Sequence, residues 1–225
     1  ASLEKKHEGQ ESRILDRGYR LLCVGTFRAA VFSFVMAPYM VRFLFGPDYL
    51  EASTPARILS VLILAWAAMP AGVLFMSSGK PQINARLGVI SAITNVTMNF
   101  ALIPFFGIQG AAVASVTSRA YAAFAGVRIC RTLYGAPFPW AFSAKALILS
   151  VLAVAPVIPA FWVWPVNGSF LQTLIVLSVT GGLYCLISAA LILWSGILDG
   201  EDRRLLAQLM AKTPLKPLAR ILGSN

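Results

Sequence analysis

The sequence predicts an all-α membrane protein, a polytopic bundle of six transmembrane helices. First, 58% of its 225 residues are hydrophobic and only 12% are charged, whereas soluble domains carry about 25% charged residues. Second, the apolar residues fall into six runs, each long enough to provide the roughly 20 residues that a helix needs to cross a bilayer. Third, no run alternates with the period of two that the strands of a membrane barrel require.

Short segments of turn-forming residues separate the six runs. Glycine and proline mark these connections, in the sequences FGPDY, SSGKPQ, FFGIQG, LYGAPFP and WPVNGS. The expected spans are roughly 19–45, 56–78, 83–106, 108–130, 141–165 and 169–196. Prolines inside several spans predict kinks, and kinked helices are common in transporters, where interrupted backbone lines a cavity.

Polar segments flank the transmembrane lobe, which we place at 19–197. The leader at 1–18 is mixed in charge and begins with Ala, so we expect a fragment whose preceding part is missing. The tail at 198–225 carries leucines at helical spacing among basic residues, for example Leu205 and Leu209 after Arg203. It is expected to form a cytoplasmic amphipathic helix on anionic headgroups, the alternative being an ordinary solvated tail.

The basic residues predict how the helices are oriented. Cytoplasmic connections of membrane proteins carry an excess of Lys and Arg. Fifteen of the 19 basic residues fall in the leader, the second and fourth connections and the tail, which all lie on one side of the predicted bundle. Both termini of this chain are therefore expected in the cytoplasm.

Composition also limits which metal or cofactor sites the chain can form. The chain has one histidine, His7, in the polar leader, and three cysteines that lie far apart in the sequence. Metal sites and disulfide frameworks use closely spaced ligands, so we expect no metal and no other cofactor. The net charge of +10 follows the expected topology, and it does not indicate binding to nucleic acid.

Two arginines inside expected spans are the candidate substrate-binding residues. Arg119 is about ten residues from each end of the fourth span, and Arg28 lies in the inner half of the first. Arginine at mid-depth costs at least ~2.5 kcal/mol on insertion scales, so it normally faces a bundle interior or a watery cavity. No Asp or Glu lies within an expected span. One interpretation is a cationic cavity that attracts an anionic passenger; the other, easier for Arg28, is snorkelling to the interface.

The third and fourth spans carry two further patterns. Small residues recur at every fourth position of the fourth span and predict close helix packing, at Gly110, Ala114, Ser118, Ala122 and Gly126. Asn95 and Asn99 lie one helical turn apart on the third span. Their amides are expected either to hydrogen-bond to a neighbouring helix or to line a sugar-accepting cavity.

Three short sequences, in this order and spacing, resemble the second half of the bacterial polysaccharide and O-antigen flippases. That family belongs to the multidrug/oligosaccharidyl-lipid/polysaccharide exporter superfamily. The sequences are FGPDY after the first span, SSGKP between the second and third, and the pattern Asn95, Asn99, Ile103, Pro104, Gly107, Ile108 and Gly110–Ala112. The resemblance extends over roughly Tyr19–Trp194.

The resemblance implies the C-terminal lobe of a protein with two six-helix lobes around a central cavity. Such proteins move an undecaprenyl-pyrophosphate-linked oligosaccharide across the bacterial cytoplasmic (inner) membrane by alternating access, without covalent chemistry. The expected partners are the lipid-linked glycan, the bilayer and the N-terminal lobe of the same protein. Arg119 and Arg28 would suit the cationic lumen of such a protein.

Other functions are less compatible with the residues. A multidrug–cation antiporter usually needs an intramembrane carboxylate, which these spans lack. A membrane glycosyltransferase needs acidic or metal-binding residues near an interface, and only Asp48 and Glu51 lie in an outer connection. A purely structural membrane subunit is the remaining alternative. We therefore do not expect an enzyme.

Overall fold

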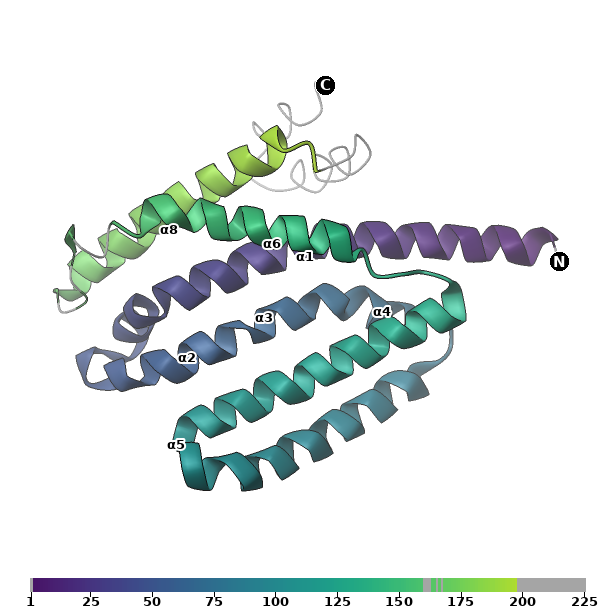
Figure 1. The fold of residues 1–225 in the computed structure, drawn as a ribbon, viewed down its shortest axis with the longest axis horizontal. Coiled ribbons are helices and arrows are strands. Elements are labelled where there is room, and N and C mark those ends of the chain that lie inside the picture. The colour runs from purple at the N-terminus through teal and green to yellow at the C-terminus, as the bar shows by residue number, and fades with distance from the viewer. Residues whose placement is uncertain (1, 160–162, 165, 167, 198–225) are drawn as a thin grey trace.

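The structure is a computed structural model that describes residues 2–159, 163–164, 166 and 168–197. Within these ranges the chain is helical and has no strand (Figure 1). The helices are α1 (Ser2–Phe45), α2 (Ser53–Ser60), α3 (Leu62–Ala65), α4 (Met69–Ser77), α5 (Pro81–Tyr134), α6 (Trp140–Val154) and α8 (Phe170–Trp194). Three short 3₁₀ helices join them: η1 (Pro47–Ala52), η2 (Trp66–Ala68) and η3 (Ala155–Val157).

The predicted class, an all-α membrane bundle, is confirmed, but the number of separate spans differs. Five helical segments, rather than six, are long and apolar enough to cross a membrane in the described part of the chain. The difference lies in α5, whose 54 residues contain both the third and the fourth expected spans. Gly107, with φ 55° and ψ −134°, interrupts this helix, and the two arms fold back beside each other (Figure 1).

The second span, expected as one helix at 56–78, is broken in several places. It comprises α2, α3, η2 and α4, which together cover Ser53–Ser77. Pro70 lies in the first turn of α4, where its missing N–H is tolerated but cannot continue a preceding α-helix. The backbone therefore tightens into a 3₁₀ turn at Trp66–Ala68, close to the middle of the span.

The ends of the lobe also differ in detail from the expected ranges. Helix α1 begins at Ser2, so the expected boundary between leader and lobe at residue 18 falls inside a continuous helix. The described helix of the fifth span, α6 continued by η3, reaches Val157, and Pro159 cannot supply a backbone donor to continue it; part of the expected range up to residue 165 lies outside the described residues. The tail at 198–225, with its expected amphipathic helix, lies outside the described residues.

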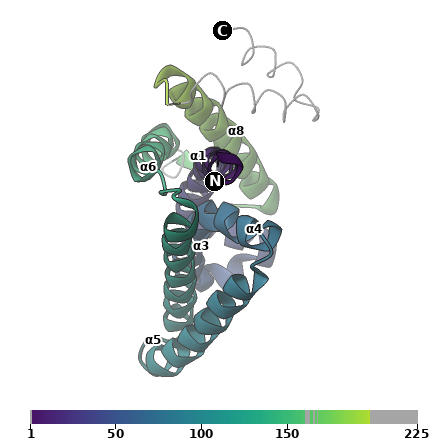
Figure 2. The same ribbon diagram turned by 90° about the vertical axis from the view of Figure 1, so that its right-hand side faces the viewer.

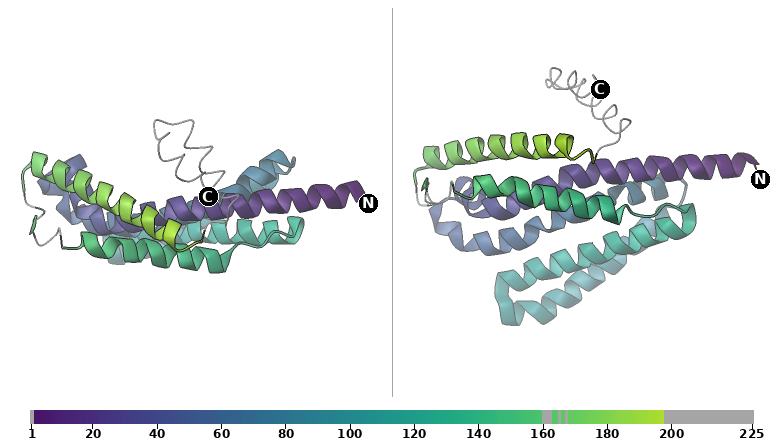
Figure 3. Two further views of the ribbon diagram at one scale, coloured as in Figure 1. Left: turned by 90° about the horizontal axis from the view of Figure 1, so that it is seen from above. Right: turned by 45° about the horizontal axis from the view of Figure 1, so that its top comes forward.

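Helix α1 is the centre of the lobe and contacts α2, α3, α4, α6 and α8. Seen end-on, α6 and α8 lie on either side of α1, and the two arms of α5 lie below this group and meet at the bottom of the view (Figure 2). The oblique view on the right of Figure 3 keeps this order, with α8 at the top and the α5 hairpin at the bottom. Buried apolar side chains connect these parts. Met36 and Tyr39 of α1 pack with Val154 and Tyr184 of α6 and α8, and Tyr19 packs with the other side of the lobe near Phe75.

The two ends of the bundle carry different contacts. At the end from which α1 starts, Lys80 lies over the Tyr134 ring at 5.2 Å and Arg20 over the Phe142 ring at 5.4 Å. At the opposite end, Arg42 donates a hydrogen bond to the carbonyl of Gly168. The connections that the basic residues assign to one side therefore do meet at one end of the structure.

Candidate functional site

Arg119 is exposed on the second arm of α5. It follows the reversal at Gly107 by twelve residues, which corresponds to about 18 Å of helix, and it lies at a similar distance from the end of the arm. Among the described residues, it has neither a hydrogen-bond nor an ion-pair partner. Its charge is therefore presented away from this chain's own packing.

The ridge of small residues on the same arm lies against the first arm of α5. Gly110, Ala114, Ser118 and Gly126 are buried, and Ala122 is partly buried. The contact is closest at Gly110, where an added Cβ would lie 2.6 Å from the carbonyl oxygen of Leu102. Arg119 is the next residue after the centre of this ridge, so it borders the contact between the arms.

Asn95 and Asn99 lie at the same contact, on the first arm. The Asn95 amide nitrogen is 3.3 Å from Ser115 Oγ and 3.4 Å from Ser118 Oγ across the hairpin. The Asn99 amide donates to the Asn95 carbonyl oxygen at 3.0 Å, and the buried oxygen of Asn99 accepts no hydrogen bond in the described chain. The Asn95 amide thus joins the two arms, and the side-chain oxygen of Asn99 has no hydrogen-bond partner among the described residues.

Arg28 is held elsewhere, between α1 and α8. Its Nε donates to the carbonyl of Val24 on its own helix at 3.0 Å, and its Nη1 lies 3.5 Å from Ser188 Oγ on α8. The structure therefore groups Arg119 with Asn95 and Asn99 around the α5 hairpin and does not bring Arg28 to them. Any role of Arg28 in binding stays a prediction.

Residues on α8 complete the surroundings of Arg28, and the sequence reasoning missed them. The Tyr184 hydroxyl donates towards two backbone carbonyls, those of Arg28 at 3.2 Å and Ser150 at 3.3 Å. Thr180, Tyr184 and Ser188 recur at every fourth position of a very apolar span and are all buried. That spacing is the signal that could have identified α8 as the polar partner of α1.

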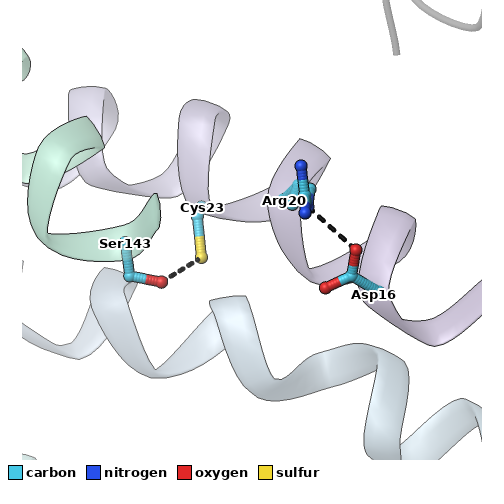
Figure 4. A network of polar contacts seen from close by, with 4 residues as sticks. All are labelled: Asp16, Arg20, Cys23 and Ser143. Atoms are coloured by element: carbon cyan, nitrogen blue, oxygen red, sulfur yellow. Dashed lines mark hydrogen bonds and ion pairs between the residues drawn. The ribbon is translucent and has the colours of Figure 1, made fainter. Parts of the chain in front are cut away.

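An open apolar cavity of about 500 Å³ lies between α1, α3, the second arm of α5 and α6. Its walls include Phe27, Leu64, Phe124, Phe138 and Leu147. Ser143, the one hydroxyl in its lining, is hydrogen-bonded at 3.3 Å to Cys23 on α1 (Figure 4). The cavity can therefore hold hydrocarbon but offers little to a polar ligand.

In the described part of the chain, no group of three His, Cys, Asp or Glu residues could hold a metal ion. The polar side chains around the α5 hairpin are an arginine, amides and hydroxyls, which can attract and hydrogen-bond an anionic or sugar-bearing ligand.

The helices and their composition define a multi-pass, all-α membrane protein. The chain is 29% identical over 119 residues to an uncharacterized membrane protein of Methanocaldococcus jannaschii. The alignment covers 47% of this chain and spans 23% of that protein's length. None of the known protein-family models matches the chain, and no solved structure does.

Proposed function

We propose that this chain is one lobe of a flippase that moves a polyprenyl-pyrophosphate-linked oligosaccharide across the bacterial cytoplasmic membrane. The second lobe would come from the N-terminal part of the same protein. The mechanism is alternating access, in which the lobes rock about a central site near the middle of the bilayer. The chain binds and releases its passenger and performs no covalent chemistry.

The observation that carries the proposal is the exposed guanidinium of Arg119. The first arm of α5 covers the neighbouring ridge, yet Arg119 itself has no partner among the described residues. A charge of this kind within a span is tolerated when it faces a cavity or another part of the protein. A pyrophosphate is the complementary group, because a guanidinium can donate two parallel hydrogen bonds to phosphate oxygens.

Two other features support a moving, sugar-binding lobe. The amides of Asn95 and Asn99 lie on the α5 hairpin that also carries Arg119, and amide side chains hydrogen-bond to sugar hydroxyls. The second span is broken between α2 and α4, and interrupted helices are the elements that transporters use to line and open a cavity. In this proposal the end that carries Lys80 and Arg20 faces the cytoplasm.

The proposal is tested in a cell that depends on the complete protein for its surface polysaccharide. Arg119→Ala is expected to reduce surface glycan at least tenfold, since losing one charge-assisted contact costs roughly 1.5–3 kcal/mol, while protein levels in the membrane stay normal. Arg119→Lys should retain part of the activity. Arg128→Ala, which removes an exposed arginine farther along the same arm, is the matched control and should export normally. Normal export by Arg119→Ala would refute the assignment.

A further inference from the structure

We propose that the apolar cavity between α6 and the second arm of α5 binds an anionic phospholipid, with one acyl chain in the cavity and the headgroup at Arg131. Helix α6 packs against α1 and α8, and the cavity lies between it and α5, where α3 is visible in Figure 1. The residues that line it lie between 27 and 147, a range that the structure describes throughout. The proposal does not rest on the transport function, because it uses neither Arg119 nor the asparagines of the hairpin.

The walls of this cavity favour hydrocarbon. They consist of alanine, valine, leucine and aromatic side chains, apart from Ser143, whose hydroxyl is already hydrogen-bonded to Cys23 (Figure 4). A water molecule held there would lack the two to four polar partners that buried water usually has, and an empty space would cost the walls their dispersion contacts. An acyl chain from the surrounding bilayer can fill the cavity without either cost.

The cavity extends through the depth of about one leaflet. Along the second arm its lining runs from Val116 to Val127, which is about 16 Å of helix, or roughly half of a hydrocarbon core about 30 Å thick. At the Val127 end, Phe138 packs nearby, and its ring lies 4.8 Å from that of Trp140. Trp140 also lines the cavity and is 62% exposed, as expected where membrane meets water. A chain whose headgroup lies at Trp140 would therefore follow the cavity towards the middle of the bilayer.

Arg131 supplies a positive charge at the same end. Phe124, Val127 and Arg131 share one face of the second arm, since they are three and four residues apart, and the first two line the cavity. Arg131 is exposed, and a helical side chain leans back over the preceding turn, which here leads to the cavity.

The guanidinium of Arg131 is available to an anion. In the described chain it forms neither an ion pair nor a side-chain hydrogen bond, and the sequence has no Asp or Glu from residue 52 to residue 198. A guanidinium can donate two parallel hydrogen bonds to a phosphate group. An apolar cavity one leaflet deep with a free guanidinium at its outer end is the complement of an anionic phospholipid.

The test is native mass spectrometry of the complete protein in detergent, titrated with phosphatidylglycerol or with phosphatidylcholine. Ala120→Trp places a bulky ring in the cavity from an exposed position. It should weaken phosphatidylglycerol binding at least tenfold, since excluding roughly two methylene groups of an acyl chain already accounts for that factor. Ala144→Trp, which fills the cavity from α6, should do the same, so the test does not depend on one variant. Arg131→Gln should weaken binding about fivefold, the effect of one basic residue near a membrane surface.

Each kind of variant has a matched control on the first arm of α5. Ala92→Trp adds the same ring at an exposed alanine, and Arg86→Gln removes an exposed charge; neither residue lines the cavity, and both variants should bind phosphatidylglycerol as the unaltered protein does.

Three results would overturn the proposal. The first is unaltered phosphatidylglycerol binding by both Ala120→Trp and Ala144→Trp, which would also hold if these variants lost only the binding of undecaprenyl phosphate. The second is equal weakening by a variant and its control, and the third is phosphatidylcholine binding as tight as that of phosphatidylglycerol. Glycan export plays no part in this readout, so the outcome is independent of the flippase assignment.

Discussion

Replacing Gly110 by alanine should destabilise the α5 hairpin. The added Cβ would lie 2.6 Å from the Leu102 carbonyl oxygen and 2.7 Å from its carbon, well inside van der Waals contact. Both atoms are backbone, so the strain cannot be relieved by turning a side chain, and the two arms must separate. Overpacking of this kind costs about 1–3 kcal/mol, which corresponds to a fall in melting temperature of roughly 2–12 °C for a protein of this size.

The assay is thermal unfolding of the purified complete protein in detergent, followed by the fluorescence of its tryptophans. Gly88→Ala is the matched control, because Gly88 is in the first arm of the same helix and a Cβ there meets no atom within 4 Å. This control should be neutral or slightly stabilising, since alanine favours helix over glycine. Equal melting temperatures for Gly110→Ala and Gly88→Ala would refute the close approach of the two arms.

Two further changes probe the same hairpin. Gly107→Ala should lower the free energy of unfolding by about 1–2 kcal/mol, because the backbone at Gly107 has a φ of +55° and a residue with a side chain disfavours positive φ. Gly182→Ala is the control, because a Cβ at this glycine of α8 meets no atom within 4 Å. Equal melting temperatures for the two variants would contradict the turn at Gly107. Asn95→Ala removes three side-chain hydrogen bonds, each worth about 0.6 kcal/mol on average within a membrane, so it should cost about 2 kcal/mol in the same unfolding assay. Asn99→Ala removes one of them and should cost less, and the reverse order would count against the observed bonding.

Much of the fold could be predicted because membrane spans carry their own signal. Length and hydropathy indicated the positions of the helices, and glycine and proline marked the reversal at Gly107. The continuity of α5 could not be foreseen, because glycine and proline mark a connection without saying how many residues leave the helix there. The break at Trp66–Ala68 and the start of α1 at Ser2 depend on packing and on backbone geometry that local composition does not encode.

The candidate site, like the fold, could be predicted only in part from the sequence. Periodicity was enough to place the small ridge on one face of the fourth span, and the structure puts that face against the first arm of α5. The expected depth of an arginine in the bilayer could not show that Arg28 packs between helices while Arg119 is exposed, because the direction of each side chain depends on which helices surround it. The hydroxyls of Tyr184 and Ser188 determine the environment of Arg28, yet they come from a helix about 160 residues away in the sequence.

The central claim is translocation of a lipid-linked glycan, and reconstitution tests it most directly. The complete protein is placed in liposomes with a fluorescent undecaprenyl-pyrophosphate oligosaccharide, and a membrane-impermeant quencher reports how fast the label moves between leaflets. We expect movement with the unaltered protein, a marked loss with Arg119→Ala and little change with Arg128→Ala. Liposomes that expel a cationic dye in exchange for Na⁺ or H⁺ while the glycan stays in its leaflet would contradict the flippase assignment.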